Sequence, residues 1–179
     1  MTLPLELWLV RHGETIANAN RRISGWTNVP LTPEGILQAR AVGSKLNGTR
    51  FDSVWSSDLQ RAIDTARLAY GVATVDTRIR EMHFGDMEDQ YWEQADPTLT
   101  SALLAFESFH PPGGESLNQF RDRIMHFIGD LSSGRHLIFT HGGVIRMLCM
   151  EFGIDRFLKN ASLIKIDWTG RRLISIEES

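Results

Sequence analysis

The sequence predicts an α/β fold, a three-layer α-β-α sandwich around a mostly parallel sheet with one antiparallel strand. The first observation is length, because 179 residues are typical of a single domain, here residues 1–179. The second is the alternation of short apolar runs with amphipathic helical stretches, which is typical of parallel sheets covered on both faces. The third is a pair of apolar runs around Thr169-Gly170, which indicates a closing hairpin.

The first half of the chain contains three predicted strands and two predicted helices. Leu5–Val10 is an apolar run that indicates a buried strand, and the polar stretch over residues 11–29 indicates a loop. Thr32 and Pro33 favour the N-cap and the first position of a helix, which we expect to end near Asn47-Gly48. The remaining elements are a strand at Ser53–Ser56, a helix from Leu59 to Tyr70 and a short strand at Ala73–Val75.

The second half continues the alternation after a segment that prolines interrupt. Pro97 and the run His110–Gly114 predict breaks in the chain, with a helix between them over Thr100–Phe109. Glu115-Ser116 opens another helix, whose apolar residues fall on one stripe. The last elements are a strand at His136–Thr140, a helix at Val144–Phe152 and hairpin strands at Leu163–Trp168 and Arg172–Ile176.

Charge is distributed unevenly along the chain. The net charge is −3, yet residues 81–120 hold eight acidic residues and no Lys or Arg. We call this segment the acidic insert. The remainder is basic, and sixteen of the 19 cationic residues are arginines, which favour bidentate binding of phosphate or carboxylate.

Other counts exclude whole classes of protein. One cysteine, Cys149, permits no internal disulfide and indicates a reducing compartment. No apolar run approaches the ~20 residues that span a membrane, and the stretch before Arg11 lacks the basic region of a signal peptide. No basic cluster or nucleic-acid-binding motif is present. We therefore expect a cytoplasmic protein with no nucleic-acid or membrane partner, and a homo-oligomer through the hairpin or an apolar helix face stays open.

Three polar clusters follow three of the predicted strands. They are Arg11-His12-Gly13, the stretch from Ser56 to Arg61, and His141-Gly142-Gly143. Because ligands bind beyond the carboxyl ends of parallel strands, these clusters predict one common site. Two arginine forks beside neutral imidazoles suit a phosphate dianion. Glu81 begins the acidic insert, which we expect to lie over this site as a lid.

Other interpretations of these clusters are weaker. A single Arg-His-Gly is more often structural than functional, and the recurrence after three strands is what favours a site. A metal site would use His12, His141 and a carboxylate. Arg11 and Arg61 oppose a cation electrostatically, and no ligand spacing supports one. Glycine-rich nucleotide loops and the serine hydrolase elbow are absent from the sequence, and Cys149 falls within an apolar helix.

The same residues resemble the signature of the histidine phosphatase (phosphoglycerate mutase-like) superfamily. The matching segments follow the family's order through nearly the whole chain: Leu9–Thr15, Asn18, Gly25, Pro30–Thr32, Gly35, Gln38-Ala39, Ser56–Ala62, Thr65-Ala66, Glu81, Phe84-Gly85, Glu88, Thr140–Gly143, Arg146 and Asn160–Ser162. Within the family, the compact size and the segment Phe109–Ser116 are similar to alpha-ribazole phosphatases of cobalamin synthesis.

The resemblance implies a phosphoglycerate mutase-like fold and assigns roles to the expected site. His12 is the implied nucleophile, which forms a phosphohistidine, and Glu81 is the implied general acid and base. Both arginines beside His12 should lower its pKa and keep it neutral. The remaining implied residues hold the phosphoryl oxygens or bind substrate: Arg11, Arg61 and His141 as the clamp, Asn18 as a donor, Gly142, and Gly13 to leave room for the phosphate. The family chemistry needs no metal ion and no cofactor.

The implied activity is that of a metal-independent phosphomonoesterase acting on a small phosphorylated metabolite such as alpha-ribazole 5'-phosphate. A cofactor-dependent phosphoglycerate mutase is the alternative enzyme. Such relatives carry paired arginines in the insert for the substrate carboxylate, whereas residues 81–120 have none. A phosphate-binding or regulatory relative without turnover is the other alternative. Five residues of the insert either suit an aromatic or neutral leaving group or form its core: Tyr91, Trp92, Phe106, Phe109 and His110.

Overall fold

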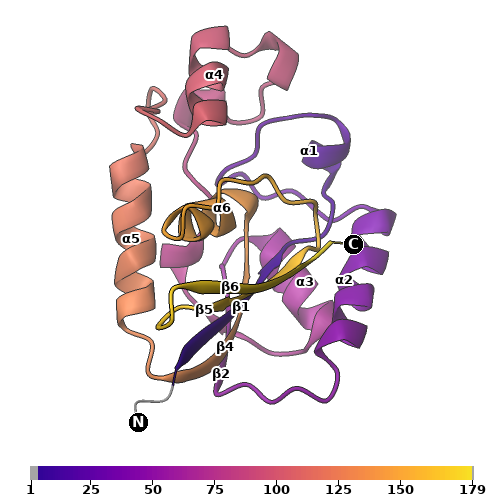
Figure 1. Ribbon diagram of the computed structural model, residues 1–179. Helices are drawn as coiled ribbons and strands as arrows, with labels where there is room; N and C mark the ends of the chain where they lie inside the picture. The colour runs from indigo at the N-terminus through magenta and orange to yellow at the C-terminus, as the bar shows by residue number, and fades with distance from the viewer. Residues whose placement is uncertain (1–3, 179) are drawn as a thin grey trace.

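A six-stranded sheet forms the centre of the structure, a computed structural model that describes residues 4–178 (Figure 1). The order across the sheet is β3-β2-β4-β1-β5-β6. The strands are β1 (Leu5–Arg11), β2 (Ser53–Ser56), β3 (Thr74–Val75), β4 (Gly134–Thr140), β5 (Leu163–Asp167) and β6 (Arg172–Glu177). Residues 1–3 and 179 of the predicted domain lie outside the described residues.

Among the described strands, β5 alone runs against the others. β4 pairs in parallel with β1 and β2, and β3 pairs in parallel with β2. β5 pairs antiparallel with both β1 and β6, so β6 runs in the direction of β1. A short turn suffices between β5 and β6, whereas the parallel strands need longer crossovers. The mostly parallel sheet with one antiparallel strand is confirmed.

Helices cover both faces of the sheet, which confirms the three-layer sandwich (Figure 1). Along β1 the side chains alternate between the two faces. Leu7 and Leu9 belong to the apolar core shared with α5 and α6, whereas Trp8 and Val10 belong to the core shared with α2 and α3. The helices are α1 (Ile16–Ala19), α2 (Pro33–Leu46), α3 (Gln60–Ala69), α4 (Pro97–Ala105), α5 (Leu117–Gly129) and α6 (Gly142–Met150).

Side-chain caps begin α1, α2 and α4, and two of these helices differ from the prediction. Thr32 caps α2 as predicted, accepting a hydrogen bond from Gly35 N at 3.0 Å. α4 begins at Pro97, where we expected a break, because Asp96 caps it and a proline tolerates the first helical position. The predicted loop over residues 11–29 contains the short helix α1, which Thr15 caps. Four residues are too few to show a helical period, so α1 left no pattern to detect.

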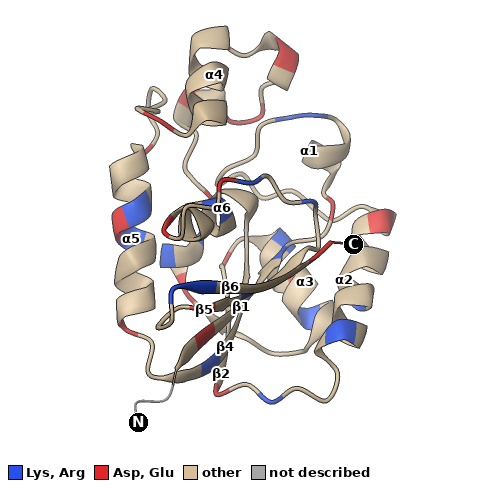
Figure 2. Cartoon of the chain, in the orientation of Figure 1, with Lys and Arg blue, Asp and Glu red and all other residues tan. Residues whose placement is uncertain are grey.

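The acidic insert consists of α4 together with two short 3-10 turns, Gly85–Met87 and Trp92–Gln94, and the start of α5. Figure 2 shows acidic but no basic residues in the segment around α4. Its carboxylates reach arginines that lie outside it, through the pairs Glu93 with Arg21, Asp89 with Arg22, and Glu115 with Arg123. Ion pairs across the boundary of the insert therefore offset the uneven charge of the sequence.

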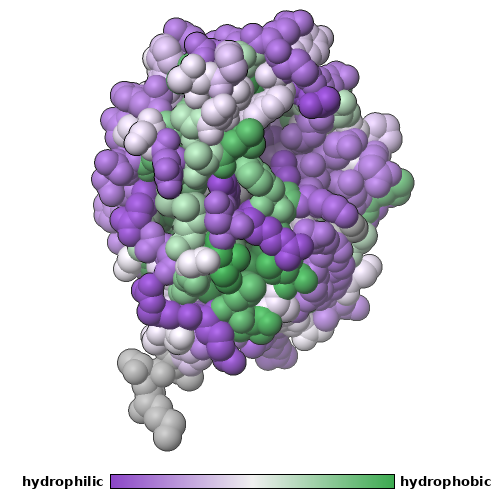
Figure 3. All heavy atoms as spheres, turned by 45° about the horizontal axis from the view of Figure 1, so that its top comes forward, coloured by the Kyte–Doolittle hydropathy of each residue, from purple (hydrophilic) through white to green (hydrophobic). Residues whose placement is uncertain are grey.

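Apolar side chains gather in one area of the face shown in Figure 3, where hydrophilic side chains surround them. Among the exposed large apolar residues of the chain, Leu104 and Phe157 expose 49% and 63% of their surface and also line the cavity described below. Scattered exposed apolar residues are ordinary, but two at one cavity bear on what it can hold. In the part of the chain that the structure describes, no helix is both long and apolar enough to cross a bilayer.

Candidate active site

The carboxyl ends of three neighbouring strands carry the three polar clusters. Arg11 ends β1 and lies in register with Thr140, which ends β4, while Ser56 ends β2 on the other side of β4. His12 and His141 follow two of these ends, and their ring centroids lie 5.2 Å apart. The parallel pairing of β1, β4 and β2 thus brings together residues that lie far apart in the sequence.

The hydrogen bonds of His12 assign its ring proton. Its Nδ1 lies 2.8 Å from the carbonyl oxygen of Gly13, and since a carbonyl only accepts, Nδ1 carries the hydrogen. Arg61 Nε donates to His12 Nε2 at 3.3 Å, which makes Nε2 the unprotonated nitrogen. Burial, followed by the charges of Arg61 and Arg11, lowers the pKa of His12 well below its ordinary value. His12 is therefore a neutral imidazole with a lone pair on Nε2.

His141 carries its ring hydrogen on the same nitrogen as His12, but the other edge of its ring is held by a neighbour. Its Nε2 lies 2.8 Å from Ser57 Oγ, which also accepts a hydrogen bond from Leu59 N at 3.2 Å. Among the described contacts, His141 Nε2 is the one acceptor for the hydrogen of this hydroxyl, so Ser57 donates to Nε2, and Nδ1 carries the hydrogen of the ring. Burial and the charge of Arg61 lower the pKa of His141 well below its ordinary value. In the described chain, His141 Nδ1 is a buried nitrogen with no hydrogen-bond partner, so it is available to donate to a ligand.

Arg61 is fixed beside His12 by main-chain carbonyls. It is 1% exposed, and it donates to the carbonyl oxygens of Gly25 at 2.6 Å and Thr27 at 3.0 Å. Burial lowers the pKa of Arg61 to about 10, which leaves the guanidinium charged at neutral pH. Glu88 accepts hydrogen bonds from the N–H groups of the same loop, including that of Gly25 at 3.0 Å, and so holds the loop that holds Arg61.

Arg11 contributes the second guanidinium. It donates through Nη1 to the carbonyl oxygen of Leu158, and its Nε is buried without a partner among the described residues. Burial lowers the pKa of Arg11, while the Glu81 carboxylate acts in the opposite direction. A Cβ on Gly142 would lie 3.3 Å from Arg11 Nε, so the glycine at the start of α6 leaves the guanidinium its space. A buried, unpaired donor costs roughly 1–3 kcal/mol, a cost that an oxyanion ligand removes.

Glu81 reaches this cluster from the start of the acidic insert. Its Oε2 accepts a hydrogen bond from Gly143 N at 3.0 Å, and its Oε1 accepts one from Met82 N at 2.9 Å. A Cβ on Gly143 would lie 2.3 Å from Glu81 Oε1. Gly143 is therefore the residue that lets the carboxylate dock at the start of α6. Sequence reasoning named Gly142 and missed Gly143, although the His-Gly-Gly motif contains both.

Two predicted substrate-binding residues are placed differently from each other. A Cβ on Gly13 would lie 2.4 Å from the carbonyl oxygen of Gly35, so Gly13 admits the close approach of α2, and its role in leaving room for the phosphate stays a prediction. Asn18 lines the cavity. Its Oδ1 accepts hydrogen bonds from Thr15 N at 3.1 Å and from Asn160 Nδ2 at 3.0 Å, which leaves its NH₂ group as the end that can donate to a ligand.

A cavity of about 290 Å³ opens beside Arg11 and Glu81. Its walls are largely apolar and come from the acidic insert and from the segment after α6, with Phe84, Trp92, Leu103, Leu104, Phe106, Phe157 and Leu158 among the lining residues. Of the five aromatic or imidazole residues considered for a leaving group, Trp92 and Phe106 line this cavity. Phe109 is 1% exposed and packs edge-to-face on Phe84, so it belongs to the core of the insert.

Two further arginines line the cavity, and sequence reasoning found neither as a cavity residue. Arg22 pairs with Asp89 at 3.0 Å. Arg146 has a side chain 4% exposed, donates to Asp155 Oδ2 at 2.9 Å and lies between the rings of Phe106 and Phe157. Each is partnered by a carboxylate, so the cavity wall beyond Arg11 carries no unpaired cation among the residues described. Within residues 4–178, no three His, Cys, Asp or Glu side chains cluster as a metal ion requires.

The fold and the site define an α/β protein with two arginines and two buried, neutral histidines beyond the carboxyl ends of its parallel strands. The chain belongs to the histidine phosphatase superfamily (branch 1), whose family model matches residues 7–178. The membership confirms the resemblance seen in the sequence and the phosphoglycerate mutase-like fold.

Relatives carry two kinds of name. The chain is 39% identical over 158 residues to phosphoglycerate mutase-like protein 4 of Arabidopsis thaliana, covering 80% of this chain and 69% of that protein. It is 37% identical over 156 residues to the adenosylcobalamin/alpha-ribazole phosphatase of Escherichia coli K12, covering 80% and 77%. The crystal structure of a phosphoglycerate mutase from Thermus thermophilus matches with a TM-score of 0.91 at 43% identity, covering 98% and 99%.

Proposed function

We propose that this protein is a metal-independent phosphomonoesterase that works through a phosphohistidine at His12. The observation that carries the proposal is that two histidines of the same tautomer contribute different nitrogens to one site. His12 offers a lone pair on Nε2, and His141 offers a hydrogen on Nδ1, within one buried cluster with Arg11 and Arg61. A nucleophile and a set of oxyanion donors are the two parts that phosphoryl transfer needs.

In the first step His12 Nε2 forms a bond to phosphorus, and the bond from phosphorus to the ester oxygen breaks. Glu81 in its protonated form gives its proton to the departing oxygen. Arg11, Arg61 and His141 hold the phosphoryl oxygens, on which the charge is spread. As Nε2 bonds to phosphorus, the His12 ring becomes positive, and the Gly13 carbonyl that accepts from Nδ1 stabilises that charge.

In the second step water attacks phosphorus from the side that the leaving group vacated. The Glu81 carboxylate takes the proton of the water, the new oxygen–phosphorus bond forms, and the bond to His12 Nε2 breaks. His12 returns to its neutral form, and inorganic phosphate leaves. The two hydrogen bonds from Gly143 N and Met82 N hold the Glu81 carboxyl group for both proton transfers.

The cavity favours a monophosphate whose remaining part is neutral and partly apolar, such as alpha-ribazole 5'-phosphate. Trp92, Phe106 and Phe157 supply aromatic surface, and the two cavity arginines beyond Arg11 are already paired with carboxylates. The similarity to an adenosylcobalamin/alpha-ribazole phosphatase supports the same substrate class. We place the acidic insert over the site as its lid, since several of its residues form the cavity wall.

A phosphoglycerate mutase is the second candidate, because a solved structure of that name matches over nearly the whole chain. A mutase needs a cation for the substrate carboxylate, and Arg22 is the cavity residue that we consider for this role. Its pairing with Asp89 weighs against the role. Rapid isomerisation of 3-phosphoglycerate in the presence of 2,3-bisphosphoglycerate would favour the mutase over our proposal.

The first test compares the parent protein with His12→Ala in the hydrolysis of p-nitrophenyl phosphate in the presence of a chelator. We expect chelator-resistant turnover in the parent and a loss of about 10³-fold or more in the variant, because the nucleophile is gone. Acid-labile, base-stable phosphate should label the parent and not the variant. Equal turnover in both proteins would contradict the mechanism, and no turnover in the parent on any phosphomonoester would favour a non-catalytic phosphate-binding protein.

A further inference from the structure

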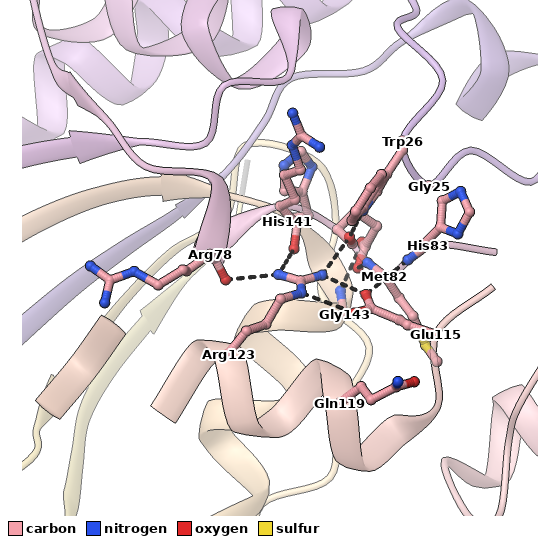
Figure 4. A network of polar contacts seen from close by, with 12 residues as sticks. Gly25, Trp26, Arg78, Met82, His83, Glu115, Gln119, Arg123, His141 and Gly143 are labelled. Carbon is pink, nitrogen blue, oxygen red and sulfur yellow. Dashed lines mark hydrogen bonds and ion pairs between the residues drawn. The ribbon is translucent and has the colours of Figure 1, made fainter. Parts of the chain in front are cut away.

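One arginine outside the cluster, Arg123 of α5, donates hydrogen bonds to the main chain around Glu81. Figure 4 shows Arg123 with Arg78 and Glu115. Arg123 Nη1 donates to the carbonyl oxygens of Arg78 at 2.7 Å and Arg80 at 2.8 Å. Its Nη2 donates to the carbonyl oxygen of Glu81 itself at 2.8 Å. Three carbonyls from one short stretch of chain therefore point at a single guanidinium.

Glu115 completes this arrangement on the other side of Glu81. It accepts from Arg123 Nε through Oε2 at 3.0 Å and from Nη2 through Oε1 at 2.6 Å. Its Oε1 also accepts from His83 N at 2.9 Å, and its own N–H donates to the His83 carbonyl at 3.0 Å. The chain is thus held before and after Glu81 by one ion pair, between Arg123 of α5 and Glu115 just before the N-cap of that helix.

The geometry uses the full donor capacity of the guanidinium. A guanidinium has five N–H donors, and Arg123 makes five hydrogen bonds, three to carbonyls and two to Glu115. The side chains of Arg123 and Glu115 are only 17% and 13% exposed, unlike an ordinary surface ion pair. A lysine carries one ammonium group with three donors, so it cannot reproduce this arrangement.

The stretch that carries Glu81 has no regular structure of its own. A 3-10 turn ends at Ile79, and residues 81–84 belong to no helix or strand. No ladder of main-chain hydrogen bonds therefore sets the position of Glu81, and contacts from side chains must do so. Besides Arg123, Trp26 Nε1 donates to the Glu81 carbonyl at 2.9 Å.

We propose that Arg123, held by Glu115, is a positioning residue that sets the Glu81 carboxyl group for proton transfer. The proposal rests on the role given to Glu81 under the proposed function. Without the fork, the Glu81 carbonyl loses its hydrogen bond to α5, and the carboxyl group shifts relative to the start of α6. Proton transfer depends on hydrogen-bond distance, so it suffers before phosphate binding does.

The test varies how much the leaving group needs a proton. For each protein, kcat/KM is measured for an alkyl phosphate, whose alkoxide must be protonated, and for 2,4-dinitrophenyl phosphate, whose phenolate leaves without a proton. Arg123→Lys should lower kcat/KM for the alkyl phosphate by about 10- to 100-fold, a part of the 10²–10⁴-fold that acid catalysis supplies. For the dinitrophenyl ester we expect a change of less than about threefold by the same principle.

Two variants make the result independent of a folding defect. Glu115→Gln keeps the shape of the side chain and an acceptor for His83 N, and it should show the same selective loss at a smaller size. Arg121→Lys is the matched control, because Arg121 lies on the same helix and pairs with Glu151 at an exposed position. This control variant should leave kcat/KM unchanged for both substrates. Equal losses on both substrates in Arg123→Lys and Glu115→Gln would overturn the proposal.

Glu81→Gln separates failure of this proposal from failure of the proposed function. If Glu81→Gln lacks the selective loss on the alkyl phosphate, Glu81 is not the general acid and the proposed mechanism is wrong. If Glu81→Gln shows the loss and Arg123→Lys does not, only the positioning role is wrong. Phosphohistidine should also accumulate in Arg123→Lys during turnover of the dinitrophenyl ester, because the attack of water on it needs the same carboxylate.

Discussion

The neighbours of two histidines decide which nitrogen of each ring is protonated. His12 faces the carbonyl of Gly13, which accepts, whereas His141 faces the hydroxyl of Ser57, which donates. Both rings therefore carry the hydrogen on Nδ1, but His12 contributes the lone pair of Nε2 to the cluster and His141 contributes the Nδ1 hydrogen. Burial keeps both neutral, since it is the main cause that lowers the pKa of each.

The lowered pKa values of His12 and His141 predict a loss of stability in mild acid. Each group takes up a proton near its usual pKa of ~6.5 in the unfolded chain but not in the folded one. The unfolded state therefore binds more protons below that pH, and the free energy of unfolding falls by about 1.4 kcal/mol per pH unit for each histidine. Urea unfolding between pH 7 and pH 5 measures this slope.

His12→Asn should remove about half of that slope. The exposed His110→Asn is the matched control and should keep the slope of the parent protein. The carboxylates with lowered pKa, such as the half-buried Asp76, act in a lower range of pH, where they lose their charge. A slope between pH 7 and pH 5 that is the same in His12→Asn as in the parent would contradict this account of the site.

At the scale of elements, the N-terminus of α6 contributes two things to the site: a partial positive charge, and space left by two glycines. Its N-cap is His141, which makes no capping hydrogen bond with its side chain, and the free N–H of Gly143 binds Glu81 instead. The partial positive charge at a helix N-terminus favours both the carboxylate and a phosphate there. Arg11 and Glu81 can approach this helix end because its first two residues, Gly142 and Gly143, have no side chains.

Gly143→Ala should therefore lower kcat by about 10²-fold or more, because a Cβ would lie 2.3 Å from Glu81 Oε1 and displace the general acid. Gly129→Ala is the control: Gly129 ends α5, and a Cβ there meets nothing within 4 Å. That variant should keep full activity and gain about 0.5–1 kcal/mol in the free energy of unfolding. Turnover of an alkyl phosphate and urea unfolding measure the two effects, and full activity in Gly143→Ala would contradict the docking of Glu81.

On the scale of the molecule, the mostly parallel sheet and the convergence of the clusters could be predicted because both follow from short local patterns along the chain. Arg11, His12 and His141 directly follow buried strands, and parallel pairing then brings them together. Arg22 and Arg146 reach the cavity through tertiary packing, and nothing at their positions in the sequence indicates it. Arg123 is likewise one of two arginines on α5, and its five acceptors become visible only when the insert is folded against this helix.

The uneven charge of the sequence produces an ion pair at the cavity, between Arg22 and the acidic insert. The acidic insert supplies no cation to the cavity, but Arg22 enters it from the basic part of the chain. Asp89 of the insert pairs with Arg22 at 3.0 Å and adopts a left-handed backbone conformation with φ of 65°. Most residue types avoid that conformation, and aspartate and asparagine tolerate it better than others. We therefore expect the pair to weaken the attraction of Arg22 for a second anionic group of a ligand.

Asp89→Asn should therefore let Arg22 interact with a second anion without straining the backbone. We expect the inhibition constant of 3-phosphoglycerate against p-nitrophenyl phosphate turnover to fall about two- to fivefold, the size of an exposed ion pair. The inhibition constant of inorganic phosphate, which has no second anionic group, should not change. Glu93→Gln removes the same charge from the insert, but Glu93 pairs with Arg21, and neither lines the main cavity, so this variant should leave both constants unchanged. If the inhibition constants of both inhibitors fall equally in Asp89→Asn, the overall charge of the insert controls binding, and the Arg22–Asp89 pair does not select the substrate.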